Sequence, residues 1–181
     1  MPESAPHILF IQTDQLSPFV LKAYGDKICH SPTIDRLAAT GIVYENAYCN
    51  FPLCAPSRFS MAAGQLASRI GAFDNAAEFP ASIPTYAHYL RAQGYQTCLS
   101  GKMHFVGPDQ LHGFEKRLTS DIYPADFEWT ADWEATEFKG ATDIRMLTSS
   151  GICARSVQLD YDEEVAHRAV GELYDIARSE D

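Results

Sequence analysis

One cysteine in this sequence stands where a nucleophile could work. Cys54 lies two residues before Pro56, and proline is tolerated in the first turn of a helix, so a helix is predicted to begin here. The amides and dipole of a helix N-terminus favour an anion, which suits a thiolate. Arg58 can present a planar pair of donors to an oxyanion, and His104 is the candidate base. A buried cysteine beside a helix-starting proline is the alternative that these residues leave open.

Polar side chains follow the ends of three predicted strands. The first group is Thr13-Asp14-Gln15, the second spans residues 49–58, and the third spans residues 101–104. In open α/β sheets, ligands bind at the carboxyl ends of the strands. Three groups at equivalent places therefore predict one shared site.

Alternating strands and helices are expected to position these groups. Apolar runs and proline or glycine punctuation predict strands at 7–13, 42–49 and 95–100, and helices at 31–41, 56–63, 84–94 and 162–178. The alternation predicts the α/β class, with a largely parallel sheet flanked by helices. Between 108 and 158 the periodicity fails, so a loop-rich region is expected. The last helix is amphipathic, and its predicted inward residues are Val165, Ala169, Val170, Leu173 and Ile176.

Composition and charge exclude several classes of protein. The 181 residues carry a net charge of −10 with no basic stripe, which argues against nucleic-acid binding, and no apolar run is long enough for a membrane span. All of the net charge lies in residues 118–181, whereas residues 1–117 are neutral and better suited to an anionic substrate. Five cysteines without framework spacing and an N-terminus without a basic, apolar leader predict a reducing, cytoplasmic setting.

Two motifs resemble those of a known family. Cys54-Ala55-Pro56-Ser57-Arg58 resembles the C-x-P-S-R signature of sulfatases, and residues 94–104 (GYQTCLSGKMH) resemble their second signature. Stretches at 74–80 and 101–114 look closest to choline sulfatases. The resemblance implies a formylglycine-dependent enzyme of the alkaline-phosphatase superfamily. Residues 1–181 would be the N-terminal part of its catalytic domain, with 108–158 as a substrate region and the C-terminal part of the family fold absent.

The resemblance also implies roles for individual residues. A separate maturation enzyme would convert Cys54 to formylglycine, whose gem-diol attacks sulfur and later expels sulfate. Asp14 and Cys54 would ligate a divalent metal, with Ca²⁺ as the first choice and Mn²⁺ as the alternative. The remaining implied site residues are Arg58 and Lys102 for charge balance, His104 for the leaving oxygen, and Asn75 as a donor to the substrate.

The substrate is expected to contain a quaternary ammonium. Aromatic and acidic residues alternate over 123–133 (YPADFEWTADW), a composition suited to cation–π contact and charge balance, and Trp129 is the predicted cage residue. The implied reaction is hydrolysis of choline-O-sulfate to choline and sulfate, with a homo-oligomer as one open assembly. Two alternatives stay open: a phosphonate or phosphodiester hydrolase of the same superfamily, and an inactive truncated sulfatase chain. Ala63-Gly64-Gln65, which replaces a threonine-glycine-arginine element, favours less efficient maturation.

Overall fold

The computed structural model describes residues 5–123, 125–127, 134 and 148–179. It divides into two compact units, an N-terminal unit (Pro2–Cys49) and a C-terminal unit (Asn50–Asp181), and each is described by itself. No helix among the described residues is both long enough and apolar enough to cross a membrane.

The N-terminal unit is built from short helical elements. These are η1 (Pro18–Val20), η2 (Lys22–Tyr24) and α1 (Pro32–Thr40). α1 begins on a proline, has Asp35 in its first turn and ends at Gly41, as the sequence predicted. The strands expected at 7–13 and 42–49 are not formed in this unit, and those predictions were wrong for the described residues. A strand needs a second strand to pair with, and the sheet in the part of the chain that the structure describes pairs β1 with β2, outside both segments.

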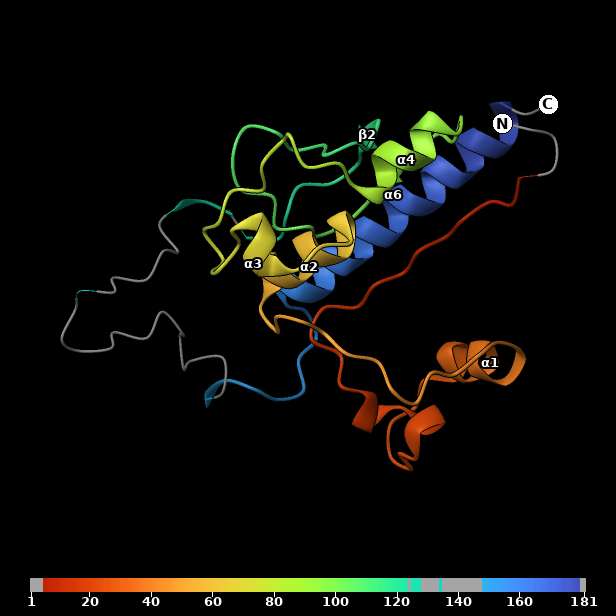
Figure 1. The fold of residues 1–181 in the computed structure, drawn as a ribbon. Coiled ribbons are helices and arrows are strands. Elements are labelled where there is room, and N and C mark those ends of the chain that lie inside the picture. Colours follow the sequence, from red (N-terminus) through yellow and green to blue (C-terminus); the bar gives the residue numbers. More distant parts are fainter. Residues whose placement is uncertain (1–4, 124, 128–133, 135–147, 180–181) are drawn as a thin grey trace. The chain divides into compact units, whose positions relative to one another are not determined.

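The C-terminal unit carries helices around a small parallel sheet (Figure 1). Its elements are α2 (Cys54–Ala63), α3 (Ala67–Ile70), α4 (Tyr86–Ala92), β1 (Cys98–Leu99), β2 (Lys116–Arg117) and α6 (Val157–Ser179). β1 and β2 pair in parallel, with Cys98 opposite Lys116 and Leu99 opposite Arg117. The α/β class with parallel pairing is therefore confirmed. β2 lies inside the stretch predicted as loop-rich. The sequence did not predict it, because its two residues are cationic and give no apolar pattern.

Stacked rings form the centre of the core in this unit. Phe59 of α2 stacks on Phe79 with ring centroids 4.5 Å apart, and Phe105 lies 6.1 Å from Phe79. All three rings are fully buried. Truncating one of them to alanine typically costs about 3–5 kcal/mol of stability. Phe59 and Phe105 thus anchor α2 and the segment after β1 to the same core.

The face of α6 that packs inward is narrower than the one predicted: Val165, Ala169 and Ile176 are partly buried, as expected, and the other two are not. The Val165 carbonyl accepts a hydrogen bond from Ser100, which follows β1, at 3.0 Å, and Ile176 is half-buried. Val170 and Leu173, predicted to face inward, are 51% and 52% exposed. Val170 follows Val165 by five residues, a turn of about 140° around a helix of 3.6 residues per turn. The buried stripe is therefore narrower than the apolar pattern suggested.

Candidate functional site

Cys54 begins α2, as the proline after it predicted, and it faces a cation. Leu53 precedes the helix without a side-chain cap, so the dipole and the first-turn amides make this end positive. The Nζ of Lys102 lies 3.6 Å from the Cys54 Sγ. The sequence separates these residues by almost fifty positions, and the fold brings them together. The helix start and the ammonium group together favour negative charge at this point.

Arg58 ties α2 to the loop that carries Lys102. Its Nη1 donates to the carbonyl oxygen of Lys102 at 2.8 Å, and the side chain is 5% exposed. A buried guanidinium with a backbone acceptor is held in one orientation, unlike a solvated cation. Arg58 is thus both a positive charge next to Cys54 and a brace for the opposite loop.

His104 is buried and has an unusual backbone. It is 4% exposed, its φ is +59°, and its Nε2 lies 2.8 Å from the carbonyl oxygen of Asn75. Burial lowers the pKa of His104, and Lys102 and Arg58 lower it further, against the raising effects of the Asn75 carbonyl and Asp121. The ring is therefore neutral at pH 7. A carbonyl only accepts, so Nε2 carries the proton and donates it to Asn75.

Asn75 bridges the helix start and the histidine. Its Oδ1 accepts from the backbone N–H of Ala55 at 3.0 Å, while its carbonyl accepts from His104. One residue therefore fixes the spacing between Cys54 and His104. Its role as a donor to substrate stays a prediction.

The structure brings five of the predicted site residues into one region. We call this set the cysteine cluster: Cys54, Arg58, Asn75, Lys102 and His104. Asp14 belongs to the N-terminal unit, which is described separately, and Trp129 lies outside the described residues. The cluster has one sulfur surrounded by cations, and among the described residues no group of three His, Cys, Asp or Glu could hold an ion. These residues alone do not fit a hard cation, which prefers several oxygen ligands.

Sequence reasoning missed the residues that hold the backbone of the loop carrying Lys102 and His104. Asp121 Oδ1 accepts from the backbone N–H of Met103 at 2.8 Å, and Thr119 Oγ1 accepts from that of Gly101 at 2.7 Å. Both follow β2, and the loop they hold follows β1. Carboxyl ends of parallel strands meet at one edge of a sheet, so recognising β2 would have found them.

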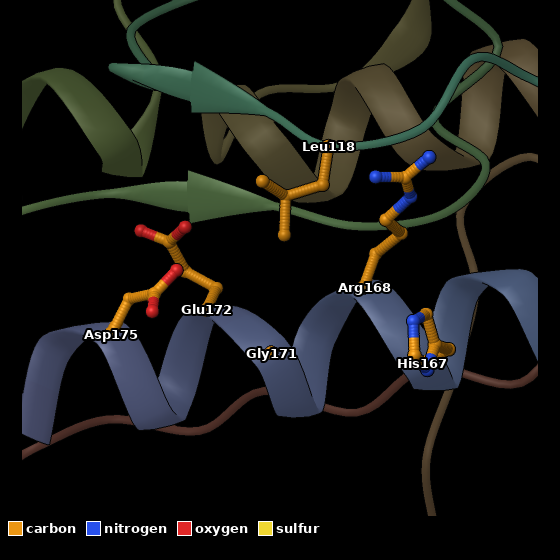
Figure 2. Close-up of a pocket in the computed structure, with 6 residues that line it drawn as sticks. All are labelled: Leu118, His167, Arg168, Gly171, Glu172 and Asp175. Carbon is orange, nitrogen blue, oxygen red and sulfur yellow. The ribbon is translucent and has the colours of Figure 1, made fainter.

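A second group of polar residues lies along α6 of the C-terminal unit. Figure 2 shows a groove between α6 and Leu118, which we call the helix groove; its residues are Leu118, His167, Arg168, Gly171, Glu172 and Asp175. None of them belongs to the cysteine cluster. Glu172 pairs with the Nζ of Lys116 at 2.6 Å, which links α6 to β2.

The fold and the cysteine cluster define an α/β protein with a positively charged site at a helix start. A sulfatase family model matches residues 6–181, and the chain therefore belongs to the sulfatase family. The chain is 47% identical over 184 residues to the choline-sulfatase of Rhizobium meliloti (strain 1021), covering 100% of this chain and 36% of that protein. It is also 32% identical over 146 residues to an N-acetylglucosamine-6-O-sulfatase of Bacteroides thetaiotaomicron, covering 77% of this chain and 26% of that protein.

A solved structure shares the fold. It is that of BT4656 in complex with its substrate D-glucosamine-2-N,6-O-disulfate, which matches with a TM-score of 0.51 and 33% identity over 54% of this chain and 19% of that one. The chain thus spans well under half the length of these relatives. The family is established for residues 6–181, and the activity of the whole protein is a separate question.

Proposed function

We propose that this chain carries the nucleophile-bearing part of the active site of a sulfuric-ester hydrolase. The observation that carries the proposal is the 3.6 Å approach of the Lys102 Nζ to the Cys54 Sγ at a helix start, with Arg58 buried alongside. A sulfate ester brings a negative charge that needs such positive partners. Membership of the sulfatase family supports the same reaction class.

Cys54 would act after conversion to formylglycine by a maturation enzyme. The modified residue supplies a hydrated aldehyde oxygen that attacks sulfur, which a thiol does not supply. Two residues near it would assist this attack. Lys102 would stabilise negative charge at the position of the Sγ, and Arg58 holds the Lys102 backbone in place. Prepositioned charges of this kind need no reorganisation during the reaction.

His104 is proposed to handle the proton of the leaving oxygen. The neutral ring that burial favours has its Nε2 proton turned to the Asn75 carbonyl. Giving that proton to a leaving alkoxide requires the ester oxygen to compete with the carbonyl of Asn75. The short brace between Asn75 and Ala55 keeps this acceptor, and hence His104, at a fixed distance from the helix start.

A divalent metal, with Ca²⁺ preferred over Mn²⁺, is also part of the proposal, and Asp14 is its proposed carboxylate ligand. Carboxylate oxygen suits a hard cation, while the cysteine cluster by itself is cationic. Isothermal titration with each ion tests this: wild-type chain should bind Ca²⁺, and an Asp14→Asn chain should bind it at least tenfold more weakly. Equal binding by both chains would contradict the assignment of Asp14.

Choline-O-sulfate is the proposed substrate. The supporting relative is the choline-sulfatase that is 47% identical over the full chain. Tyr123, at the start of the aromatic and acidic segment 123–133, accepts a 2.6 Å hydrogen bond from Gln158 of α6 and is 42% exposed. This contact ties Tyr123 to α6, and Trp129 is the proposed ammonium-binding residue.

A substrate panel tests the proposed function. Protein co-expressed with the maturation enzyme is given choline-O-sulfate, an alkyl sulfate of equal length without the ammonium group, and a phosphonate monoester. We expect the fastest turnover on choline-O-sulfate. Preference for the uncharged sulfate would contradict the choline assignment, and preference for the phosphonate would favour the phosphonate hydrolase. No turnover of any ester by protein with an aldehyde at Cys54 would show an inactive chain.

A further inference from the structure

We infer that Asp121 is a positioning residue for the loop that carries Lys102 and His104, an inference that rests on the proposed function. Asp121 holds this loop by its backbone. Its carboxylate Oδ1 accepts a hydrogen bond from the backbone N–H of Met103 at 2.8 Å, and Met103 lies between Lys102 and His104. The tether therefore holds both neighbours through the backbone.

The partner of Asp121 keeps that carboxylate in one place. Arg117 Nη2 lies 2.9 Å from the same oxygen, and the two side chains are only 10% and 8% exposed. The Arg117 Nε also donates to the Thr119 carbonyl at 3.1 Å, and its guanidinium lies 5.6 Å from the centre of the Phe105 ring. A charged pair buried this far and bonded on several sides has little freedom to reorient.

The loop from Gly101 to His104 needs such a tether. Gly101 has φ +109° and His104 has φ +59°, and a non-glycine residue rarely adopts the left-handed region unless its surroundings impose it. Thr119 Oγ1 holds the Gly101 N–H, and Asp121 holds the Met103 N–H. Without Asp121 the backbone at His104 would be free to return to a commoner conformation, which would move the ring and Lys102.

The surroundings of Asp121 make this role specific. Tyr161 of α6 donates its hydroxyl proton to the Ser120 carbonyl at 2.7 Å, and Ser100 donates to the Val165 carbonyl at 3.0 Å. α6 thus fastens both loops, the one after β1 and the one after β2. Asp121 is the side chain that joins the two loops at the residue before His104.

Two substitutions separate positioning from general stability. Asp121→Asn keeps an oxygen that can accept the Met103 N–H, whereas Asp121→Ala removes it. Asp109→Ala is the matched control, because Asp109 accepts two backbone N–H groups, those of Leu111 and His112, which lie outside residues 101–104. Each chain is studied by steady-state sulfate release and by amide hydrogen exchange at Met103.

We expect Asp121→Ala to lose protection of the Met103 amide and to lower kcat about 100-fold, with a smaller change in KM, because small displacements of catalytic groups are costly. Asp121→Asn should restore protection and most of kcat, and Asp109→Ala should leave both unchanged. The inference is overturned if Asp121→Ala keeps Met103 protected, or if Asp109→Ala lowers kcat as much. If the wild-type chain itself releases no sulfate, the proposed function fails, while the exchange measurement still decides whether Asp121 holds the loop.

Discussion

The cysteine cluster and the helix groove both gather charged side chains on the C-terminal unit, but they hold them differently. In the cluster, Arg58 is 5% exposed and bonded to a backbone carbonyl. In the groove, the Arg168 side chain (Figure 2) is 58% exposed. Its Nε lies 3.8 Å from the Oε1 of Glu164, a neighbour on the same helix. Exposed pairs of this kind are screened by solvent and contribute little.

The difference teaches where fixed charge is available for chemistry. A guanidinium or ammonium group helps a reaction most when it is already oriented before the substrate arrives. In the cluster that orientation comes from backbone contacts supplied by two loops and a helix start. In the groove, Glu172 is held by Lys116, but the exposed Arg168 pairs with a neighbour on its own helix. The predictions below test this contrast from the largest expected effect to the smallest.

Removing the ammonium group next to Cys54 should have the largest effect. Lys102→Ala is expected to lower kcat for sulfate release by about 10²–10³-fold, since one preorganised charge partner typically contributes that much. Lys116→Ala is the matched control, because Lys116 pairs with Glu172 at the helix groove. Steady-state kinetics on choline-O-sulfate measure both. An equal loss of kcat in the two variants would contradict the proposed difference between the cysteine cluster and the helix groove.

Removing the Arg58 guanidinium from the cysteine cluster should lower stability more than removing the Arg168 guanidinium from the helix groove. Arg58→Ala takes a charged donor from the Lys102 carbonyl in a buried place, and we expect a loss of about 1–3 kcal/mol in the free energy of unfolding. Urea unfolding measures it. Arg168→Ala should leave the urea midpoint within error, and a larger loss for Arg168 than for Arg58 would reverse the comparison.

Acidification should lower the free energy of unfolding through the buried His112. Burial beside Phe79 lowers the pKa of His112 below its ordinary 6.5, reinforced by His88 and Arg117 and opposed by Asp109. The unfolded chain therefore binds this proton at a higher pH than the folded chain. The resulting stability is present above pH 6.5 and is lost as the pH falls below it.

Unfolding titrations between pH 5 and pH 8 measure this loss. In the His112→Phe chain, which keeps an aromatic ring beside Phe79, the decline below pH 6.5 should be shallower than in wild type. A decline of identical steepness in both chains would show that His112 does not contribute.

The smallest expected effect is a gain of stability in the groove. A Cβ added at Gly171, which lies within α6, would have no neighbour within 4 Å. Gly171→Ala should therefore raise the free energy of unfolding by about 0.4–1 kcal/mol through the lower entropy of the unfolded chain. Thermal unfolding measures the gain, and sulfate release should be unchanged. Loss of activity in this variant would give the groove a role in the reaction.

The sequence predicted helices better than strands. Pro32 and Gly41 bracket α1, and Pro56 with Gly64 brackets all but the first two residues of α2, because these residues act locally. Strand formation depends on a partner distant in the sequence. The apolar run at 7–13 predicted a strand that the N-terminal unit does not form, while the cationic pair Lys116-Arg117 forms β2 without any apolar signal.

The site could be predicted to a similar extent. Its motifs placed Cys54 and Lys102 in one cluster, and the structure shows their 3.6 Å approach. The restraints on them could not be read in the same way. Asp121 stands in an aperiodic acidic stretch, and only the parallel pairing of β1 and β2 brings it to the Met103 amide. The reactive residues stand in short motifs that can be recognised in the sequence. The residues that position them are brought into place by the pairing of β1 and β2, which the sequence did not predict.

Sulfate release by wild-type, Cys54→Ala and Cys98→Ala chains, each co-expressed with the maturation enzyme, tests the central claim most directly. Cys98 is a suitable control, because it is half-buried and burial, with Glu172, raises the pKa of its thiol to about 11. The account predicts that wild-type and Cys98→Ala chains release sulfate from choline-O-sulfate and that Cys54→Ala does not. Turnover that survives the loss of Cys54 would contradict it.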